Sequence, residues 1–296
     1  MTTHRNPDFL IIGAQKSGTT WLHQQLATHP QVFMPAGKDD EFFSYLPDKP
    51  LADYHSKFSN AGSSQRVGDS CASYFWSPLA DGEQPTGFNP DIAATIRHQL
   101  GPSCRLIVLL KEPVQRSVSA YLHHIAHGSL DCNVPLHAAP ARLGLSAISH
   151  YGQHLAYWLK HFPPQQILPL PAPGAAPAEE LLRRCCDFLD LDKSHSFPQP
   201  QNTVYAGLRR RWRDDGVWLM LGQRGLEQAD RIQRPLPLQQ WGDESWVRLV
   251  HPAEIERLRS LLKPDVIQLA ELIRQHGWLH EAFERWPDWP GESSDI

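Results

Sequence analysis

Residues 13–21 read Gly-Ala-Gln-Lys-Ser-Gly-Thr-Thr-Trp, a run that brings two glycines, a lysine and three hydroxyl side chains together. Glycine permits a tight turn and a close approach of the backbone to a ligand. Backbone N–H groups at the start of a helix bind phosphate-like anions. Lys16 adds a mobile positive charge, and Ser17, Thr19 and Thr20 add hydroxyl donors. The run therefore predicts an anion-binding site.

A second candidate anion site lies at residues 111–119, Lys-Glu-Pro-Val-Gln-Arg-Ser-Val-Ser, directly after an apolar run. The proline suits the first turn of a helix, where its missing N–H group costs nothing. Ser119 is expected to lie away from the apolar stripe of this helix. Arg116 either binds phosphate or forms a surface ion pair. Two such helix starts suit a ligand that carries phosphates at both ends.

Residues 37–43, Gly-Lys-Asp-Asp-Glu-Phe-Phe, form a compact acidic run that ends in two aromatic residues. A carboxylate can accept the proton of an attacking hydroxyl, and Asp39 and then Glu41 are the candidates for this role. Lys38 can neutralise charge that develops during the reaction, and Asp40 is expected to be peripheral. The alternative is a solvated acidic turn whose two phenylalanines pack in the core.

Two groups of histidines have spacings that suggest a metal site. One group is His123, His124 and His127, and the other is His150 with His154. Neither group has the cysteine or carboxylate partners of a convincing metal centre. We therefore expect no metal and interpret these histidines as solvated or hydrogen-bonded. The run Arg-Arg-Arg-Trp-Arg at 209–213 caps a nucleotide, attracts an anionic acceptor or is a solvated face.

The elements that position these residues follow from the hydrophobic pattern. Apolar runs predict buried strands at 9–12, 105–110 and 167–170, with a weaker one at 66–69. Helices are predicted at 19–29, 91–100, from Pro113 onward, and at 151–162, 179–189, 207–216 and 252–277. Strands that alternate with helices predict an α/β fold with a mainly parallel central sheet covered on both faces.

The chain has 296 residues, 41% hydrophobic and 20% charged, which is the composition of a globular protein. We predict a single domain over residues 1–296, with a core at about 8–202 and a helical, Arg- and Trp-rich part at about 203–296. The 28 basic and 32 acidic residues give no general attraction to nucleic acid or membranes.

The location of the protein is predicted from three features. An odd number of cysteines, five, suits a reducing compartment. The apolar runs are far too short to span a bilayer, and the first residues lack the basic start and apolar stretch of a signal peptide. We therefore expect a soluble, cytoplasmic protein.

In its two anion motifs the chain resembles the sulfotransferases that use 3′-phosphoadenosine-5′-phosphosulfate (PAPS). Their phosphosulfate loop reads Lys-Ser/Gly-Gly-Thr-Thr/Ser, frequently followed by Trp, as at 16–21 here. Their 3′-phosphate motif looks like Arg-x-Pro-x-x-Arg-x-x-Ser, and here its first arginine is Lys111, which keeps the charge but loses the bidentate fork. An ordinary nucleotide triphosphatase loop places lysine after its second glycine. Here Lys16 precedes Gly18, which favours phosphosulfate over ATP.

Further similarity extends from about residue 8 to Asn202, through segments at 29–32, 68–74, 151–170 and 186–191, with a looser match at 263–265. Two departures stand out. The position of Ser70 usually holds a substrate-contacting lysine in the glycosaminoglycan branch, which weakens a heparan-like assignment. The acidic pair common after the strand at 167–170 is replaced by Pro-Ala-Pro.

The resemblance implies a three-layer, P-loop-like sulfotransferase fold and a role for each matched residue. Lys16 contacts the phosphosulfate and stabilises the leaving phosphate, and Trp21 stacks on adenine or, alternatively, packs in the core. Aligned on the two phenylalanines, Asp39 takes the place of the family's glutamate and Glu41 that of its histidine. The implied donor-binding residues are Gln15, Lys16, Ser17, Gly18, Thr19, Thr20, Trp21, Lys111, Arg116 and Ser119.

The predicted function is therefore transfer of a sulfuryl group from PAPS, without a metal, to a hydroxyl or amine of a saccharide or small molecule. The alternatives are a P-loop nucleotide kinase or NTPase, and a non-catalytic nucleotide-binding protein of the same fold. The acceptor and the oligomeric state are not specified by the sequence.

Overall fold

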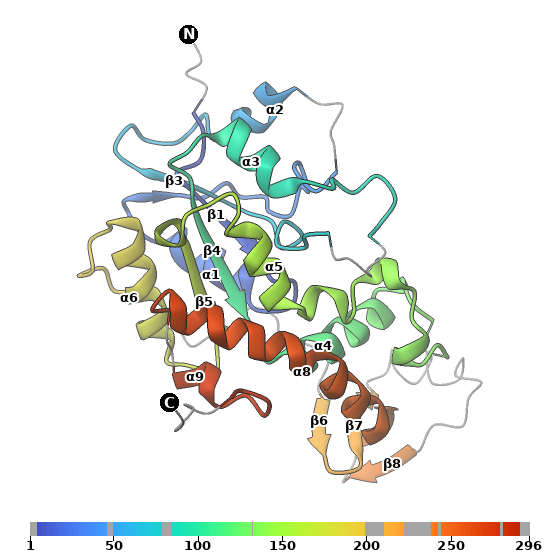
Figure 1. Cartoon of the computed structure of the whole chain (residues 1–296). Coiled ribbons are helices and arrows are strands. Elements are labelled where there is room, and N and C mark those ends of the chain that lie inside the picture. The colour runs from blue at the N-terminus through green and yellow to red at the C-terminus, as the bar shows by residue number, and fades with distance from the viewer. Residues whose placement is uncertain are drawn as a thin grey trace.

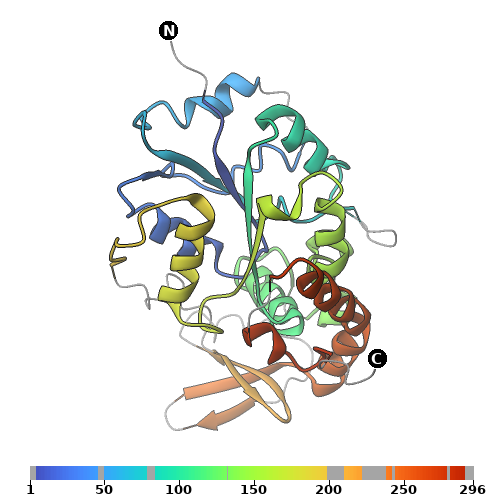
Figure 2. The same cartoon turned by 60° about the vertical axis from the view of Figure 1, so that its left-hand side comes forward.

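The structure is a computed structural model that describes residues 5–45, 50–78, 84–131, 133–198, 210–221, 238–241, 244–278 and 281–290. Within this part of the chain, helices enclose a central parallel sheet, and a second, antiparallel sheet lies at the lower end of the molecule as drawn in Figure 1 (Figures 1 and 2). The predicted α/β class is confirmed.

The central sheet has five strands in the order β2-β3-β1-β4-β5, and every neighbouring pair is parallel. The strands are β1 (Phe9–Gly13), β2 (Val32–Phe33), β3 (Arg66–Ser70), β4 (Arg105–Leu110) and β5 (Ile167–Pro171). The predicted strands at 9–12, 66–69, 105–110 and 167–170 are confirmed to within one residue. The strands at 9–12, 105–110 and 167–170 are recognisable because strands buried on both faces are apolar at nearly every position, whereas the weaker one at 66–69 has only Val67 as an apolar side chain.

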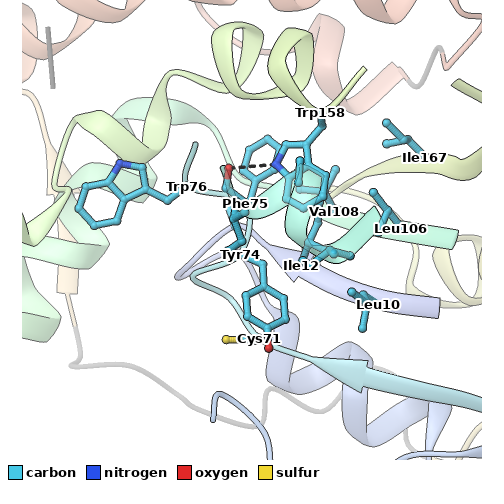
Figure 3. Packing of buried hydrophobic residues seen from close by; sticks show 14 of the residues in the cluster. Leu10, Ile12, Cys71, Tyr74, Phe75, Trp76, Leu106, Val108, Trp158 and Ile167 are labelled. Atoms are coloured by element: carbon cyan, nitrogen blue, oxygen red, sulfur yellow. Dashed lines mark hydrogen bonds between the residues drawn. The ribbon is translucent and has the colours of Figure 1, made fainter. Parts of the chain in front are cut away.

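Helices cover the two faces of this sheet because successive side chains of β1 point to opposite sides. Phe9 and Ile11 pack against α1 (Thr19–Leu26) and α6 (Ala178–Leu189). Leu10 and Ile12 pack on the other face, under α3 (Ile92–Leu100) and α5 (Tyr151–Trp158). Figure 3 shows this second face, where the indole of Trp158 donates a hydrogen bond to the Phe75 carbonyl at 3.4 Å.

Most of the predicted helices are present, with their ends shifted by a few residues. The helix after β4 is α4 (Pro113–Ala126), and α2 (Leu51–Ser56) is a short addition. The helix predicted at 252–277 is α8 (Pro252–Gln275), followed by the short α9 (Glu281–Glu284). Asp91 caps α3 by accepting a hydrogen bond from the Ala94 N–H group at 3.3 Å.

The helix predicted at 207–216 is wrong where the structure describes it, since residues 207–209 lie outside the described part. Here β6 (Arg210–Arg213) and β7 (Gly216–Leu221) form an antiparallel hairpin. They continue a sheet in the order β6-β7-β9-β8, with β8 (Leu238–Trp241) and β9 (Glu244–Val250). An Asp-Gly pair followed by Val-Trp-Leu-Met-Leu is a hairpin signal, so the C-terminal part is not helical throughout.

The long helix α8 ties this part to the core. Asp265 on α8 is buried and accepts hydrogen bonds from the N–H groups of Gly152 (2.8 Å) and Gln153 (2.9 Å), the second and third residues of α5. Burial raises the pKa of Asp265 to about 6. Gly152 is required here, because a Cβ atom on it would lie 2.7 Å from the Asp265 carbonyl oxygen.

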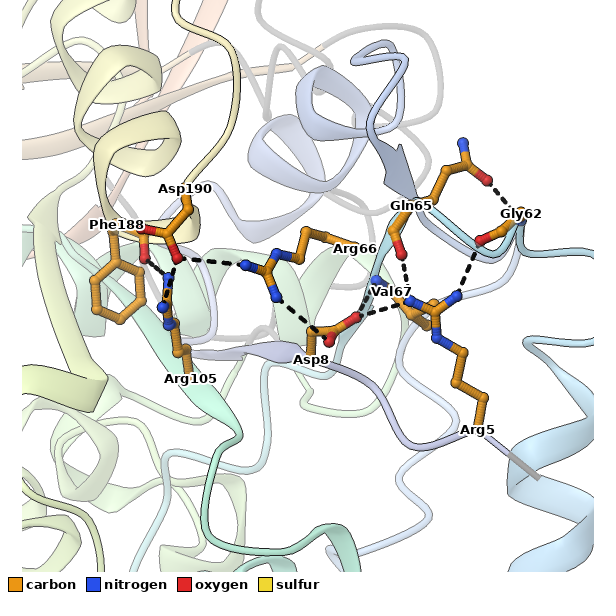
Figure 4. Close-up of polar contacts among 9 residues, drawn as sticks. All are labelled: Arg5, Asp8, Gly62, Gln65, Arg66, Val67, Arg105, Phe188 and Asp190. Carbon is orange, nitrogen blue, oxygen red and sulfur yellow. Dashed lines mark hydrogen bonds and ion pairs between the residues drawn. The ribbon is translucent and has the colours of Figure 1, made fainter. Parts of the chain in front are cut away.

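Charged side chains gather at the amino ends of the strands (Figure 4). Arg66 lies between Asp8 (3.8 Å) and Asp190 (3.3 Å), and Arg105 pairs with Asp190 at 2.6 Å. All four side chains are partly exposed, so these pairs contribute little each. They lie at the edge of the sheet opposite to the two anion motifs.

Candidate active site

Both anion motifs lie at the carboxyl edge of the sheet, after the neighbouring strands β1 and β4. The chain leaves β1 toward β2 and β3 on one side, whereas it leaves β4 toward β5 on the other. In open α/β sheets, ligands bind at such a reversal of strand order. The fold thus brings the two motifs to one place.

The turn after β1 depends on its two glycines. Gly13 has φ 154°, and a Cβ atom on it would lie 2.6 Å from Cβ of Phe75. Gly18 has φ 101°, and a Cβ atom there would lie 2.6 Å from Cδ of Pro173, in the loop after β5. Gly18 is also the N-cap of α1, and no side chain caps this helix. A helix start of this kind presents its N–H groups to an anion.

Lys16 contacts a residue from the other motif's helix. Its backbone has φ 67°, and its ammonium group donates to Nδ1 of His123 on α4 at 3.2 Å. Desolvation, followed by the charges of Lys16 and the nearby histidines, lowers the pKa of His123 to about 4. His123 is therefore neutral at pH 7 and able to accept this hydrogen bond.

Ser17 and Gln15 have buried polar atoms with no hydrogen-bond partner, Oγ and Oε1 respectively. Ser17 lies near enough to Tyr151 to influence its pKa, but the Tyr151 hydroxyl donates to the Lys111 carbonyl at 2.9 Å instead. Since a buried polar group without a partner is unfavourable, these atoms mark the turn as a place where a polar ligand fits.

The first three residues of α1 differ in their surroundings. Thr19 is buried and Thr20 is half-buried. Trp21 is 5% exposed and packs in the apolar cluster of α1, α6 and the sheet. This placement corresponds to the core alternative for Trp21, and its stacking on adenine remains a prediction.

The turn after β4 is built differently, because Glu112 already caps α4. Its carboxylate accepts hydrogen bonds from the N–H groups of Val114 (3.1 Å) and Gln115 (2.7 Å). Desolvation raises the pKa of Glu112 against the effect of these two bonds. Of the two helix starts predicted to suit an anion, that of α4 therefore has its N–H groups of Val114 and Gln115 bound to the Glu112 carboxylate of the chain itself.

Arg116 is fully buried, so the predicted surface ion pair is wrong. Its Nε donates to Ser149 Oγ at 2.5 Å, and Nη2 donates to the carbonyls of Gly144 (3.0 Å) and Leu145. Desolvation lowers its pKa to about 10, which leaves the guanidinium charged at pH 7. Nη1 is buried without a partner, and phosphate binding by Arg116 stays a prediction.

Lys111 and Ser119 flank the start and the middle of α4. Lys111 is half-buried and Ser119 is 7% exposed. Ser119 and His123 are four residues apart on α4, so they lie on one helical face. Because His123 contacts Lys16, this face is directed toward the turn after β1.

The acidic segment, residues 37–43, lies against the end of β3. The Asp39 N–H group donates to the Ser70 carbonyl (2.9 Å), and the Asp39 carboxylate accepts from the Ala72 N–H group (2.8 Å) and from the Lys38 ammonium. Phe42 and Phe43 pack in the core. The solvated-turn alternative predicts this core placement of the phenylalanines, but the carboxylates of Asp39 and Asp40 are bound by other groups of the protein.

Glu41 has the electrostatic setting of a base. Partial desolvation and then the charges of Asp39 and Asp40 raise its pKa, although the residue as a whole is exposed. A raised carboxyl pKa brings proton affinity nearer to neutral pH, where general bases work. Asp39, by contrast, has both oxygens engaged.

Three residues near these motifs were missed as site residues. The histidine spacing draws attention to His123 only as a metal ligand, although its position four residues after Ser119 places it on the same helical face. His23 on α1 is buried beside Lys38 and Asp39, with Nδ1 unpartnered and its pKa lowered, chiefly by desolvation. Lys57 contacts Asp40 at 2.7 Å. The contacts of His23 and Lys57 depend on tertiary packing and leave no local signal.

Other expectations concern metals, membranes and the arginine run. Among the residues that the structure describes, no group of three or more His, Cys, Asp or Glu side chains is arranged to hold a metal ion. Within the described ranges, none of the helices combines the length and the apolar composition that a membrane span requires. Of residues 209–213, Trp212 is 40% exposed and Arg213 pairs with Asp215 at 3.6 Å, whereas residue 209 lies outside the described part.

Known proteins are similar to this chain in sequence and in fold. The human heparan sulfate glucosamine 3-O-sulfotransferase 6 is 30% identical over 174 residues, which cover 55% of this chain and 46% of that protein. The bifunctional heparan sulfate N-deacetylase/N-sulfotransferase 1 of Caenorhabditis elegans is 32% identical over 181 residues, which cover 55% of this chain and 19% of that protein. The chain thus spans less than half the length of these curated relatives.

A sulfotransferase from Alicyclobacillus acidocaldarius has a similar fold, with a TM-score of 0.61 at 19% identity, over 94% of this chain and 99% of that one. The predicted sulfotransferase fold is confirmed by this likeness. The model of the sulfotransferase domain matches residues 6–193, which include β1 to α6 and both anion motifs. The chain belongs to the sulfotransferase family.

Proposed function

We propose that this protein transfers a sulfuryl group from PAPS to a hydroxyl or amine of a saccharide or small molecule. The observation that carries the proposal is the pair of anion motifs at the reversal of strand order between β1 and β4. A nucleotide with phosphates at its 5′ and 3′ ends fits two such turns on neighbouring strands. Membership of the sulfotransferase family supports the reaction type.

The turn after β1 is the place for the 5′-phosphosulfate. The uncapped start of α1 and the unpartnered Ser17 hydroxyl would hold its oxygens. The donor supplies an activated sulfuryl group, and Lys16 would place its positive charge where the leaving phosphate gains negative charge. Lys16 would exchange its hydrogen bond to neutral His123 for contacts with this anion.

The turn after β4 is the place for the 3′-phosphate, held by side chains. Lys111 and Ser119 are the donors, since the backbone N–H groups at the start of α4 are bound to Glu112. A single lysine charge and a hydroxyl give less directional binding than the arginine fork that the family motif carries at the position of Lys111.

Glu41 is our choice for the general base that deprotonates the hydroxyl or amine of the substrate. The sequence analysis ranks Asp39 first and Glu41 second, so this choice reverses their order. Its raised pKa favours proton acceptance. The Asp39 carboxylate is engaged by the Ala72 N–H group and the Lys38 ammonium, which suits it to fixing the loop.

The acceptor is proposed to be a saccharide or small molecule. The curated relatives named above act on heparan sulfate, which supports a saccharide. Ser70, at the position where the glycosaminoglycan branch usually has a lysine, argues for an acceptor with less negative charge than heparan sulfate. The cytoplasmic location and the oligomeric state stay predictions.

Ligand-dependent thermal unfolding tests the donor assignment. Adenosine 3′,5′-bisphosphate at a hundred times its Kd should add about 2.7 kcal/mol of stability. At the same concentration, ATP with magnesium should add less, because it has no 3′-phosphate for the turn after β4 and should bind more weakly. A larger shift with ATP and magnesium would instead favour a nucleotide kinase. Sulfate-labelled donor, tested on a panel of saccharides and phenols, then identifies the acceptor.

Two isosteric variants assign the base. We expect Glu41→Gln to lose about a hundredfold or more of kcat, with unchanged binding of adenosine 3′,5′-bisphosphate, and Asp39→Asn to lose less. In the wild type, kcat should decline at acidic pH with a midpoint above the ordinary Glu pKa, because the base must be deprotonated. The reverse ranking returns the role to Asp39, and full activity in both variants removes the acidic segment from proton transfer.

A further inference from the structure

Lys57, at the end of α2, joins two carboxylates from different parts of the chain. Its ammonium donates to both oxygens of Asp69 on β3, at 3.0 and 2.9 Å, and to Asp40 in the acidic segment, at 2.7 Å. The Lys57 side chain is 19% exposed and Asp69 is fully buried. We call this three-residue contact the Lys57 bridge.

At the Asp69 end of the bridge, the carboxylate is buried and both of its oxygens accept hydrogen bonds. Asp69 also accepts a hydrogen bond from the Tyr54 hydroxyl at 2.9 Å. The Lys57 ammonium lies 5.0 Å from the centre of the Tyr54 ring, which adds a cation–π contact. Burial lowers the pKa of Lys57, but the Asp69 and Asp40 carboxylates outweigh this effect and leave it raised. Lys57 is therefore a fixed positive charge.

The Asp40 end of the bridge holds a strained backbone. Asp39 and Glu41 have φ 58° and 56°, in the left-handed region that residues other than glycine rarely adopt. Asp40 lies between them. Such conformations persist only where surrounding contacts enforce them, and they gather at functional sites. Here the contacts of Asp39 with Ser70 and Ala72 tie one side of the segment to β3, and the bridge ties the next residue.

We propose that Lys57 is a positioning residue that holds the acidic segment, and with it Glu41, in its reactive orientation by linking Asp40 to the buried Asp69. This inference rests on the proposed function for its catalytic consequence, but its structural part does not. Asp40, which was predicted to be peripheral, is thereby the residue through which Lys57 holds the segment in place.

A purely stabilising role for Lys57 is the competing explanation, because a lysine beside a buried carboxylate stabilises the fold by itself. The two explanations differ at Asp40. Neutralising Asp69 needs only the Lys57–Asp69 half of the bridge, whereas positioning needs the Lys57–Asp40 half. A change at Asp40, which is on the surface, separates them without disturbing the buried pair.

Hydrogen exchange tests the bridge without any donor or acceptor. We expect Asp40→Asn to raise amide exchange at residues 37–45 by roughly fivefold or more, with exchange in β3 and α2 unchanged. Asp53→Asn is the matched control, since it removes an exposed carboxylate from α2 that makes no contact with the segment. Unchanged exchange at 37–45 in Asp40→Asn overturns the proposal.

Kinetics test the catalytic consequence at a pH where kcat has reached its plateau, because Asp40 also influences the Glu41 pKa. We expect Asp40→Asn and Lys57→Met each to lower kcat by roughly tenfold to a hundredfold, with unchanged Kd for adenosine 3′,5′-bisphosphate. Lys57→Arg should restore most of kcat. The double variant should be no slower than Lys57→Met, since both changes break one link.

The outcomes keep this inference and the proposed function apart. A folded Lys57→Met variant with full kcat, or additive losses in the double variant, overturns the positioning role. If Lys57→Met does not fold, Asp40→Asn decides alone, and full kcat in it contradicts the proposal. If the wild-type protein transfers no sulfate to any acceptor, the proposed function fails while hydrogen exchange still decides the bridge.

Discussion

The turns after β1 and β4 occupy equivalent places in the sheet but differ in the groups that they offer to a bound anion. The turn after β1 leads into a helix that no side chain caps, with an unpartnered Ser17 hydroxyl in the turn. The turn after β4 leads into a helix whose first N–H groups are bound to the Glu112 carboxylate. The first turn thus offers backbone dipoles to a ligand, and the second offers only side chains.

This difference predicts unequal tasks for the two ends of the donor. Backbone N–H groups are fixed before the ligand arrives, so they suit the end where charge develops during the reaction. Flexible side chains such as Lys111 suit an end that is only bound, because their contacts change little between ground state and transition state. Variants in the first turn should therefore affect kcat, and variants in the second should affect KM.

Lys16→Ala should have the largest effect and tests the first half of this comparison. We expect kcat to fall by about a hundredfold to a thousandfold, because Lys16 stabilises charge on the leaving phosphate. Single-turnover sulfate transfer measures this loss, and Lys160→Met, at an exposed lysine on another surface, is the control. If Lys16→Ala raises donor KM and leaves kcat unchanged, both turns only bind the donor, and the proposed difference between them is wrong.

Arg116→Leu tests whether the second turn uses Arg116 for the ligand or for its own fold. We expect the free energy of unfolding to fall by about 3 kcal/mol, since Ser149, Gly144 and Leu145 lose their buried donors. Chemical denaturation measures this loss. If Arg116 serves only the fold, the Kd for adenosine 3′,5′-bisphosphate changes by less than about threefold at a temperature where the variant is folded. A tenfold weaker Kd would assign the unpartnered Nη1 to the 3′-phosphate.

The central sheet and most of its helices could be predicted from the sequence because their signals are local. The run at 105–110 is apolar at five of its six positions, and Pro113 marks a helix start within three residues. The helix predicted at 207–216 is wrong where β6 and β7 are described, because an Arg- and Trp-rich composition does not distinguish a helix from a hairpin, whereas the Asp-Gly turn at 215–216 favours a hairpin.

The site was predictable in its residue types and less so in their contacts. The glycine pattern located the turn after β1, since only glycine tolerates the φ angle and the 2.6 Å approach of Pro173 at Gly18. The burial of Arg116 and the contact of Lys16 with His123 join residues 28 to 107 positions apart. Such contacts are set by tertiary packing, which periodicity does not encode.

Lys111→Ala and Ser119→Ala test the second half of the comparison at smaller magnitude. We expect Lys111→Ala to raise donor KM about tenfold, and Ser119→Ala to raise it less, both with kcat nearly unchanged. Lys111→Arg should lower donor KM, because a guanidinium forms a bidentate contact with phosphate. A drop in kcat without a change in KM would mean that the turn after β4 takes part in the chemical step.

Glu112→Ala should have the smallest effect and examines the feature that separates the two turns. Removing the cap of α4 should lower the free energy of unfolding by about 1 kcal/mol. It also removes a negative charge beside the proposed 3′-phosphate and frees the N–H groups of Val114 and Gln115. We therefore expect binding of adenosine 3′,5′-bisphosphate to strengthen by roughly twofold to fivefold, as measured by calorimetry.

Asp91→Ala is a control for that change, because the Asp91 carboxylate also accepts a hydrogen bond from an N–H group at a helix start, that of Ala94 on α3, but belongs to neither anion motif. It should lower stability by at least as much, because Asp91 also accepts a hydrogen bond from the Tyr157 hydroxyl at 2.5 Å, and it should leave nucleotide binding unchanged. Weaker binding in Glu112→Ala, with unchanged binding in Asp91→Ala, would mean that the capped turn itself forms the phosphate site. Glu112 would then contribute to phosphate binding by fixing the shape of the turn at the start of α4. In that case the contrast with the uncapped start of α1 would no longer explain how the two ends of the donor are held.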